Sequence, residues 1–231
     1  MAVKTRSRRR APRRSLPPVI ADHLPVWLLL AAVMSILFPN ALPVMLNAAG
    51  QVISRVPEWV GSLFAGPSPI APLFTDEIDH WARDIGRWAE EHELEPNLLA
   101  TVMQIESCGH PTISSYVGAQ GLFQVMPFHF TAGENQLDPD TNARRGAAYL
   151  KWCVDYSGGD VGLTLACYNG GPSVVKKPFA AWSSETQRYY RWGTGIYADA
   201  LANQSRSDTL DRWLAAGGGG LCDMAAGELG L

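Results

Sequence analysis

An uncharged, strongly apolar stretch near the N-terminus constrains this chain more than any other feature. No Asp, Glu, Lys or Arg occurs from Pro25 to Ser54, and residues 26–38 are almost purely apolar. Seven of the 19 basic residues precede this stretch, within residues 4–14. A helix that continues to Leu46 approaches the roughly 20 residues that span a bilayer. Basic residues before such a helix place the N-terminus inside, so we expect a membrane segment followed by an exported body.

A cleaved signal peptide is the alternative to a transmembrane anchor at residues 24–46. The dense apolar run alone has the length of a signal-peptide core, and small residues follow it at positions 47–49. With an anchor, residues 1–23 form a basic cytoplasmic N-terminus, and a single-pass protein in the cell (inner) membrane presents its body on the periplasmic or extracellular side. With cleavage, the body is secreted.

The charge and composition of the body exclude two classes of protein. Hydrophobic residues make up 47% of the chain, which excludes a wholly disordered protein. The net charge is −3 although the N-terminus is basic, so the body is acidic. We therefore expect no nucleic-acid partner.

Hydrophobic periodicity predicts a mainly α domain at residues 76–202. Prolines punctuate residues 47–75, which we expect to be a linker, and glycine-rich residues 203–231 are expected to form a C-terminal helix and a flexible tail. Strand alternation is nearly absent, which leaves at most a small β-hairpin around residues 112–121. Amphipathic or capped segments predict helices at residues 78–89, 142–156, 160–168 and 185–202, and a largely buried helix that opens at Glu95-Pro96-Asn97 and stops at Gly109 and Pro111.

Glu106 is a carboxylate without a neighbouring charge. It ends an apolar helix, and no Asp, Glu, Lys or Arg follows from Ser107 to Gly133. Apolar surroundings raise the pKa of a carboxyl group, and a protonated carboxyl near neutral pH is suited to be a general acid in glycosidic cleavage. A solvent-exposed residue at the end of a helix is the alternative.

Cysteines and histidines indicate disulfides and no metal site. Four cysteines on the exported side permit three complete pairings. Cys153 and Cys167 lie on successive predicted helices and are the preferred pair, whereas Cys222 in the tail is expected to be free and Cys108 to be a small buried hydrophobe. The histidines are scattered, without metal-ligand spacing, so we expect no metal and no cofactor.

Four ordered motifs carry a resemblance to a known family. Residues 105–107 read Ile-Glu-Ser and are followed by the run from Gly118 to Pro127, residues 138–150 hold Asp-Pro, Asn142 and Gly146, residues 166–171 read Ala-Cys-Tyr-Asn-Gly-Gly, and Glu185-Thr186 precedes a Tyr-Tyr pair. From about Trp81 to Tyr197 the chain resembles the soluble lytic transglycosylase-like (SLT) domain, which is related to goose-type lysozymes and cleaves peptidoglycan glycan strands. Together the motifs are far more specific than any one of them.

The resemblance implies an α+β lysozyme-like fold and a set of site residues. Glu106 would be the single catalytic acid and base. The residues implied to support it or to bind substrate are Ser107, Gln124, Met126, Tyr168, Asn169 and Glu185.

Carboxylate placement favours one reaction among those open to the family. Goose-type lysozymes place helper Asp residues after the Glu, and here that stretch has none; the nearest downstream acids are Glu134, Asp138 and Asp140. We expect lytic transglycosylation, in which the C6 hydroxyl of N-acetylmuramic acid replaces water and a 1,6-anhydro sugar forms. The alternatives are a muramidase and a non-catalytic wall-binding component of a secretion or conjugation apparatus, whose protein partners the sequence does not identify.

Overall fold

The computed structural model describes residues 67–231 of the chain. The expected basic N-terminus and the expected membrane segment at residues 24–46 lie outside the described residues. Within residues 67–231, none of the helices combines the length and the apolar character that a membrane crossing requires.

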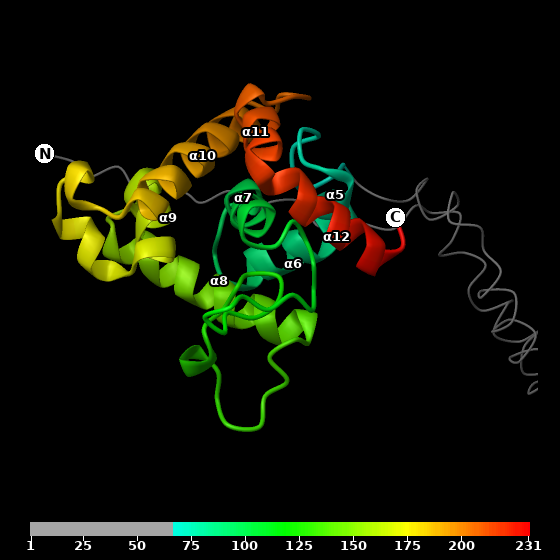
Figure 1. Ribbon diagram of the computed structural model, residues 1–231, viewed down its shortest axis with the longest axis horizontal. Coiled ribbons are helices and arrows are strands. Elements are labelled where there is room, and N and C mark those ends of the chain that lie inside the picture. The colour runs from blue at the N-terminus through cyan, green and yellow to red at the C-terminus, as the bar shows by residue number, and fades with distance from the viewer. Residues whose placement is uncertain (1–66) are drawn as a thin grey trace, which may run out of the picture. The chain divides into compact units, whose positions relative to one another are not determined.

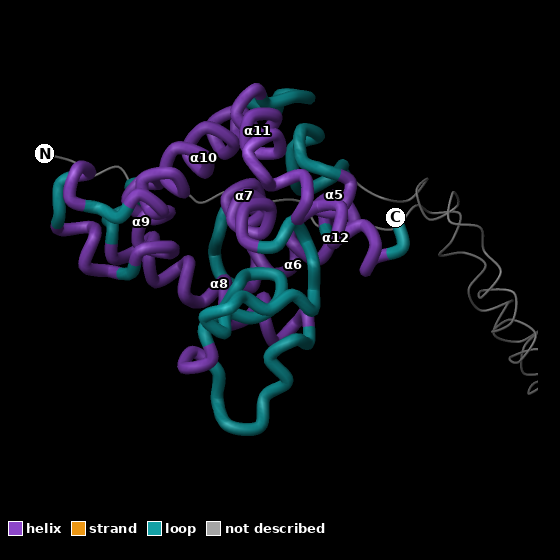
Figure 2. The backbone as a smooth tube through the Cα atoms, in the orientation of Figure 1, coloured by secondary structure: helices purple, strands orange, loops and turns teal. Residues whose placement is uncertain are grey.

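The described part of the chain is helical, which confirms the expected class. Figure 2 shows helices joined by loops, and no strand occurs within residues 67–231. Two isolated bridges, Ser114 with Gln120 and Gln120 with Val125, are all that remains of the expected hairpin. The α-helices are α5 (Asp76–His80), α6 (Ala82–Glu91), α7 (Pro96–Glu106), α8 (Pro139–Tyr156), α9 (Val161–Gly170), α10 (Ser184–Leu201), α11 (Asp208–Trp213) and α12 (Gly219–Leu229). Short 3-10 turns are η1 (Pro127–His129), η2 (Pro172–Lys176) and η3 (Phe179–Ala181), and a π-helical turn, η4 (Leu214–Gly218), joins α11 to α12.

Helix α7 is the buried centre of the domain. It contacts α5, α6 and α10, and Figure 1 shows it among the other helices. Leu99, Val102 and Met103 are fully buried, as expected for a helix that is apolar on most of its surface. Because α7 is held on several sides, the residue at its C-terminal end, Glu106, has a fixed position.

Polar residues just before the helices fix where these begin. Glu95 accepts a hydrogen bond from the Leu98 amide at 2.8 Å, and Asp138 accepts one from the Thr141 amide at 2.9 Å. These side chains satisfy amides that have no partner within the helix. Both α7 and α8 begin with a proline, whose missing amide hydrogen costs nothing at a position that has no partner within the helix.

The expected helix over residues 78–89 is two helices. The chain leaves helical geometry at Trp81, with φ −91° and ψ 3°, between α5 and α6. The Trp81 indole donates a hydrogen bond to the Gly109 carbonyl at 2.9 Å. This long-range contact accompanies the break, although Ile78, Ile85 and Trp88 are all buried as one apolar stripe predicts.

The end of the expected linker belongs to the domain core. Ile70, Ala71, Leu73 and Phe74 are buried in the same cluster as the α7 side chains. The Ala71 amide also donates to the Asn97 side chain at 2.7 Å. The last residues of the expected linker therefore pack with the domain, because the apolar side chains among the prolines are buried in its core.

The expected flexible tail is an ordered helix. Gly217 does bend the chain, with φ 127°, but α12 continues after it. A disulfide joins Cys222 of α12 to Cys108, with the Cα atoms 5.0 Å apart, and Ala225 is fully buried. The expectation that Cys222 is free is therefore wrong. Residues 203–231, outside the predicted catalytic domain, pack back against that domain and bring Cys222 to Cys108. A second disulfide joins Cys153 of α8 to Cys167 of α9, the pair preferred from the sequence.

The long connection between α7 and α8 is fixed by one buried amide. Asn142 accepts a hydrogen bond from the Phe123 amide at 2.9 Å and donates to the Gln120 carbonyl at 2.7 Å. A Cβ on Gly121 would meet the Asn142 side chain at 2.7 Å, so glycine is required for this approach.

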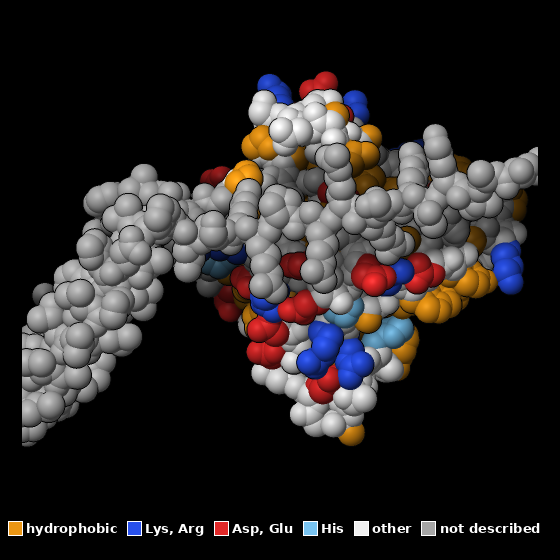
Figure 3. Space-filling model, turned by 180° about the vertical axis from the view of Figure 1, so that it is seen from behind, with side chains coloured by type: hydrophobic (Ala, Val, Ile, Leu, Met, Phe, Trp, Pro, Cys, Tyr) orange, Lys and Arg blue, Asp and Glu red, His pale blue; other side chains and the backbone are white. Residues whose placement is uncertain are grey.

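On one face of the molecule, acidic and basic side chains lie beside exposed hydrophobic ones (Figure 3).

Candidate active site

Glu106 is partly buried at the C-terminal end of α7. Burial raises the pKa of its carboxyl to about 8, and the negative charge of Glu185 acts in the same direction. Near neutral pH the carboxyl therefore holds a proton in most molecules. A protonated carboxyl can donate a proton, whereas an exposed glutamate with an ordinary pKa is ionised at this pH and cannot.

A cavity of about 240 Å³ contains Glu106 together with two other residues that the sequence singled out. Asn169 comes from the end of α9, and Glu185 from the first turn of α10. The Asn169 side-chain oxygen accepts a hydrogen bond from the Thr186 hydroxyl at 2.9 Å, which fixes the amide. Ile105, Arg188, Tyr189, Trp192 and Trp213 complete the lining.

Two tyrosine hydroxyls lie near the Glu106 carboxyl. Burial raises the pKa values of Tyr168 and Tyr189, and the charge of Glu106 raises both further. The Tyr189 hydroxyl favours the charged form of Glu106 and so lowers its pKa. This hydroxyl is buried and has no hydrogen-bond partner of standard geometry among residues 67–231. It is therefore available to a group that arrives with the substrate or to a newly formed carboxylate.

A smaller cavity, of about 50 Å³, contains the other predicted cleft residues. Gln124 and Met126 line it from the connection between α7 and α8, and Tyr168 lines it from α9. Val125, His129 and Tyr149 complete the lining. The predicted residues thus fall into two groups: Asn169 and Glu185 line the cavity of Glu106, and Gln124, Met126 and Tyr168 line the smaller cavity. The negative charge of Glu106 raises the pKa of Tyr168, which places these two residues near each other.

Ser107 has a different position from the one that the resemblance implied. Its side chain is fully buried, and its hydroxyl donates to the Leu122 carbonyl at 2.6 Å. The Tyr168 hydroxyl similarly donates to the Phe123 carbonyl at 2.8 Å. Ser107 is therefore not accessible to a substrate. Its hydrogen bond to Leu122 holds the connection between α7 and α8 against the end of α7.

The backbone at Gln124 is in the left-handed region, with φ 44°. This conformation is uncommon for a residue other than glycine and often occurs at functional sites. The Gln124 side chain donates to the Gly121 carbonyl at 3.1 Å and to the Ile113 carbonyl at 3.3 Å. These bonds hold the amide at the wall of the smaller cavity.

The three nearest acids downstream of Glu106 in the sequence are occupied elsewhere. Arg145 bonds Glu134 at 2.7 Å and holds the pKa of that carboxyl at about 2. Asp140 pairs with Arg87 at 2.6 Å, and Asp138 caps α8. Glu185, exposed at the rim, is the other carboxylate that lines the cavity of Glu106.

Sequence reasoning missed the contribution of the C-terminal segment. Trp213 of α11 lines the cavity of Glu106, although residues 203–231 were expected to lie outside the catalytic domain. Leu210 and Trp213, three residues apart and both buried, form a short apolar pattern that is the only local signal. Arg188 and Trp192 were also missed, because nothing in the periodicity of α10 distinguishes its cavity face.

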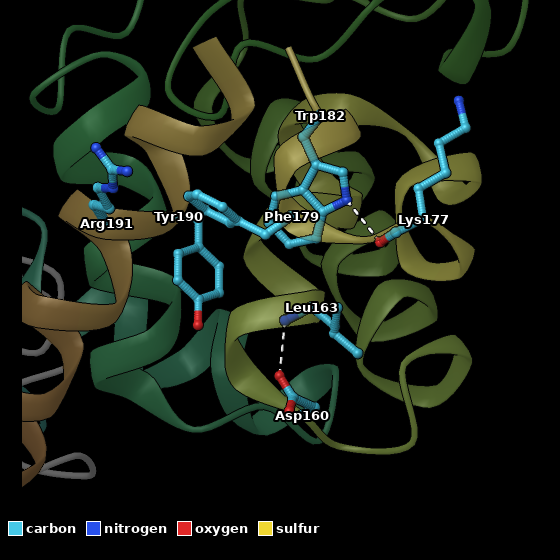
Figure 4. Close-up of a pocket in the computed structure, with 7 residues that line it drawn as sticks. All are labelled: Asp160, Leu163, Lys177, Phe179, Trp182, Tyr190 and Arg191. Atoms are coloured by element: carbon cyan, nitrogen blue, oxygen red, sulfur yellow. Dashed lines mark hydrogen bonds between the residues drawn. The ribbon is translucent and has the colours of Figure 1, made fainter. Parts of the chain in front are cut away.

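Two other features do not contribute to this site. Glu77, Cys108 and Cys222 lie close enough to hold a metal ion, but the two sulfurs are bonded to each other and are not thiolate ligands. A larger cavity, of about 490 Å³, lies between the start of α9 and the segment before α10 (Figure 4). It does not include Glu106; aromatic rings of Phe179, Trp182 and Tyr190 line it together with Asp160, Leu163, Lys177 and Arg191.

Known proteins resemble the part of the chain that builds the site. Residues 84–190 match the family described as Transglycosylase SLT domain. The transglycosylase of Enterobacteria phage PRD1 is 39% identical over 113 residues, which cover 47% of this chain and 40% of the phage protein. The soluble lytic murein transglycosylase of Escherichia coli (strain K12) is 29% identical over 102 residues, or 39% of this chain and 16% of that protein.

A solved structure also resembles the chain. An inactive mutant of the lytic transglycosylase Slt from Pseudomonas aeruginosa superposes with a TM-score of 0.44 at 26% identity, over 54% of this chain and 24% of that one. The chain thus spans less than half the length of each of the curated relatives named above.

Proposed function

We propose that this chain, whose residues 84–190 match the transglycosylase SLT domain family, is a peptidoglycan lytic transglycosylase with a lysozyme-like catalytic domain. Glu106 is its single catalytic acid and base. The observation that carries the proposal is the raised pKa of Glu106, about 8, in a cavity large enough for part of a sugar. A general acid must hold its proton at the pH at which it works.

The first step is proton donation by Glu106. The proton passes to the oxygen of the β-1,4 bond between N-acetylmuramic acid and N-acetylglucosamine, and the bond from that oxygen to the muramic acid C1 breaks. The leaving sugar keeps the oxygen as a hydroxyl group. Positive charge at C1 is stabilised by the substrate's own N-acetyl group and by the new carboxylate of Glu106.

The second step regenerates the acid. The C6 hydroxyl oxygen of the same muramic acid attacks C1, and its proton passes to Glu106, so a 1,6-anhydromuramoyl end forms without water. Because the nucleophile is part of the substrate, its effective concentration is high and no second carboxylate has to position it. Tyr189, whose buried hydroxyl has no hydrogen-bond partner within residues 67–231, donates to the carboxylate between the two steps.

A muramidase is the second candidate, and Glu185 is the observation that favours it. Glu185 lines the same cavity as Glu106 and is the group that would activate a water molecule in an inverting hydrolase. Glu185 is exposed at the rim, where its charge is well hydrated. We favour the lytic reaction because the C6 hydroxyl of the bound muramic acid is an intramolecular nucleophile and needs no second carboxylate to activate water.

The cellular setting is also a proposal. Residues 24–46 anchor the protein in the cell membrane, with residues 1–23 inside and the SLT domain facing the wall. The support is the absence of Asp, Glu, Lys and Arg from Pro25 to Ser54 after a basic N-terminus. Cleavage of the same segment would give a secreted enzyme, and service within a secretion or conjugation apparatus would be compatible with either arrangement.

Product analysis tests the reaction. The full-length protein, Glu106→Gln and the surface control Glu90→Gln are each incubated with purified peptidoglycan, and the released muropeptides are identified by mass spectrometry. We expect anhydro-muropeptides from the wild type and from Glu90→Gln, and none from Glu106→Gln. Reducing-end products would identify a muramidase, and silence from the wild type would leave a wall-binding component.

A further inference from the structure

A row of aromatic side chains leads from the candidate active site along the surface of α8. Tyr149 lines the same small cavity as Tyr168, and the two ring centroids are 5.4 Å apart. Trp152 follows Tyr149 at 6.0 Å, and Tyr156 follows Trp152 at 4.9 Å. We call Tyr149, Trp152 and Tyr156 the aromatic strip. Their spacing of three and four residues places them on one face of the helix.

The rings of the strip are partly exposed and nearly parallel to one another. Trp152 is 45% exposed and Tyr156 is 38% exposed. The ring planes differ by 8° between Tyr149 and Trp152 and by 12° between Trp152 and Tyr156, so the three rings are nearly parallel. At the far end the Lys176 ammonium lies 5.8 Å from the Tyr156 ring centroid. Contiguous exposed aromatic surface usually marks a binding site.

The inner end of the strip is fixed in place. The Tyr149 hydroxyl donates to the Cys167 carbonyl at 3.3 Å, and the Cys153–Cys167 disulfide joins α8 to α9 at the same level. The His129 ring also packs on Tyr149, with centroids 4.7 Å apart, and burial lowers the pKa of His129. A neutral imidazole can pack against apolar surface without the cost of burying a charge.

These observations identify the kind of molecule that the strip fits. We infer that the aromatic strip is an extended glycan-binding surface, on which sugars of the same strand lie beyond those bound at Glu106 and in the small cavity that Tyr149 lines. The inference rests on the proposed function. Pyranose rings present apolar C–H faces to aromatic rings and keep their hydroxyl groups in water, which suits half-exposed Trp and Tyr side chains. Continuity through Tyr149 with the small cavity favours the substrate strand over an unrelated partner.

The strip then discriminates substrates by length. A long strand contacts Glu106 and the strip together, whereas a short oligosaccharide fills only the cavities. Loss of the outer rings should weaken productive binding of long strands and leave the chemistry at Glu106 unchanged.

The test compares strands of two lengths. Peptide-free glycan strands are separated into long strands and short oligosaccharides, and kcat/KM for release of anhydro ends is measured with the full-length wild type, Trp152→Ala, Trp152→Ala/Tyr156→Ala and Trp152→Phe. Leu201→Ala, which removes a 62% exposed side chain at the end of α10, is the control. Thermal melting verifies that each variant folds.

We expect a change confined to long strands. Trp152→Ala/Tyr156→Ala should raise KM for long strands at least fivefold with kcat preserved, and change kcat/KM for short oligosaccharides less than twofold. Trp152→Phe keeps an aromatic ring at this position, so its KM for long strands should stay close to that of the wild type. Equal effects on both lengths, or no effect on either, would overturn the inference while product release by the wild type upholds the proposed function. If the wild type releases nothing, the proposed function fails, and equilibrium binding of the same strands to the same variants decides the inference by the same pattern.

Discussion

A disulfide between Cys108 and Cys222 fastens α12 two residues after Glu106. The sequence separation of the two cysteines is 114 residues, against 14 for Cys153 and Cys167. The bond closes a loop that contains most of the domain and fixes the chain that follows the candidate acid.

Removal of this disulfide should destabilise the domain more than removal of the other. In the chain-entropy account, a disulfide that closes a loop of over 100 residues contributes about 5 kcal/mol, and one that closes about 15 residues contributes about 3 kcal/mol. Cys108→Ser/Cys222→Ser should therefore lower Tm more than Cys153→Ser/Cys167→Ser, as differential scanning calorimetry can measure. The reverse order would mean that α12 is fastened by packing alone.

The charge of Glu185 should set part of the pH dependence. Glu185 raises the pKa of Glu106, so its neutralisation in Glu185→Gln lowers that pKa. Activity requires protonated Glu106, and the alkaline limb of kcat/KM should move to lower pH by roughly half a unit, as a partly solvated charge pair allows. Glu90→Gln should leave the limb in place. A limb that stays fixed in Glu185→Gln as well would show that the two carboxyls are not coupled.

The Tyr189 hydroxyl should act in the opposite direction. It favours the charged form of Glu106, so Tyr189→Phe raises the pKa of Glu106 and moves the alkaline limb upward by about one pH unit. Turnover should fall as well, because the carboxylate formed in the first step loses a donor. Tyr197→Phe makes the same change further along α10 and serves as control. A downward movement of the limb in Tyr189→Phe would contradict the assigned contact.

The raised pKa of Glu106 should cost stability at high pH. The ordinary carboxyl pKa is 4.5 and the folded value is about 8. Below pH 4.5 the group is protonated in both folded and unfolded chains; as the pH rises toward 8, ionisation favours the unfolded chain. Glu106→Gln removes this effect, so its gain in stability over the wild type should grow from pH 4 to pH 8, to on the order of 2 kcal/mol. Thermal melts across that range measure it, and a constant difference would place Glu106 in contact with bulk water.

Local signals predicted most of the helices and singled out Glu106 as the candidate acid. Glu106 could be singled out because it ends an apolar helix and precedes a long uncharged stretch, and the capped start of α7 follows from Glu95-Pro96. Both features lie within a few residues of sequence. The preferred Cys153–Cys167 pair likewise bridges successive helices.

Long-range contacts explain what the sequence did not reveal. Trp213 reaches the cavity of Glu106 only because α11 packs against α10. The glycines around Gly217 indicate flexibility by their propensity, yet the close approach of Gly218 to the Trp213 ring and the Cys108–Cys222 bond order that segment. Ser107 has the same kind of explanation, since its partner, Leu122, lies on a loop whose path depends on the buried Asn142.

Isotope incorporation tests the central claim most directly. Peptidoglycan is digested by the full-length protein in water enriched in oxygen-18, and the new chain ends are weighed by mass spectrometry. If Glu106 is acid and base for attack by the muramic acid's own C6 hydroxyl, every new muramoyl end is an unlabelled anhydro sugar. New reducing ends that carry one oxygen-18 atom each would show that water is the nucleophile and would contradict the account.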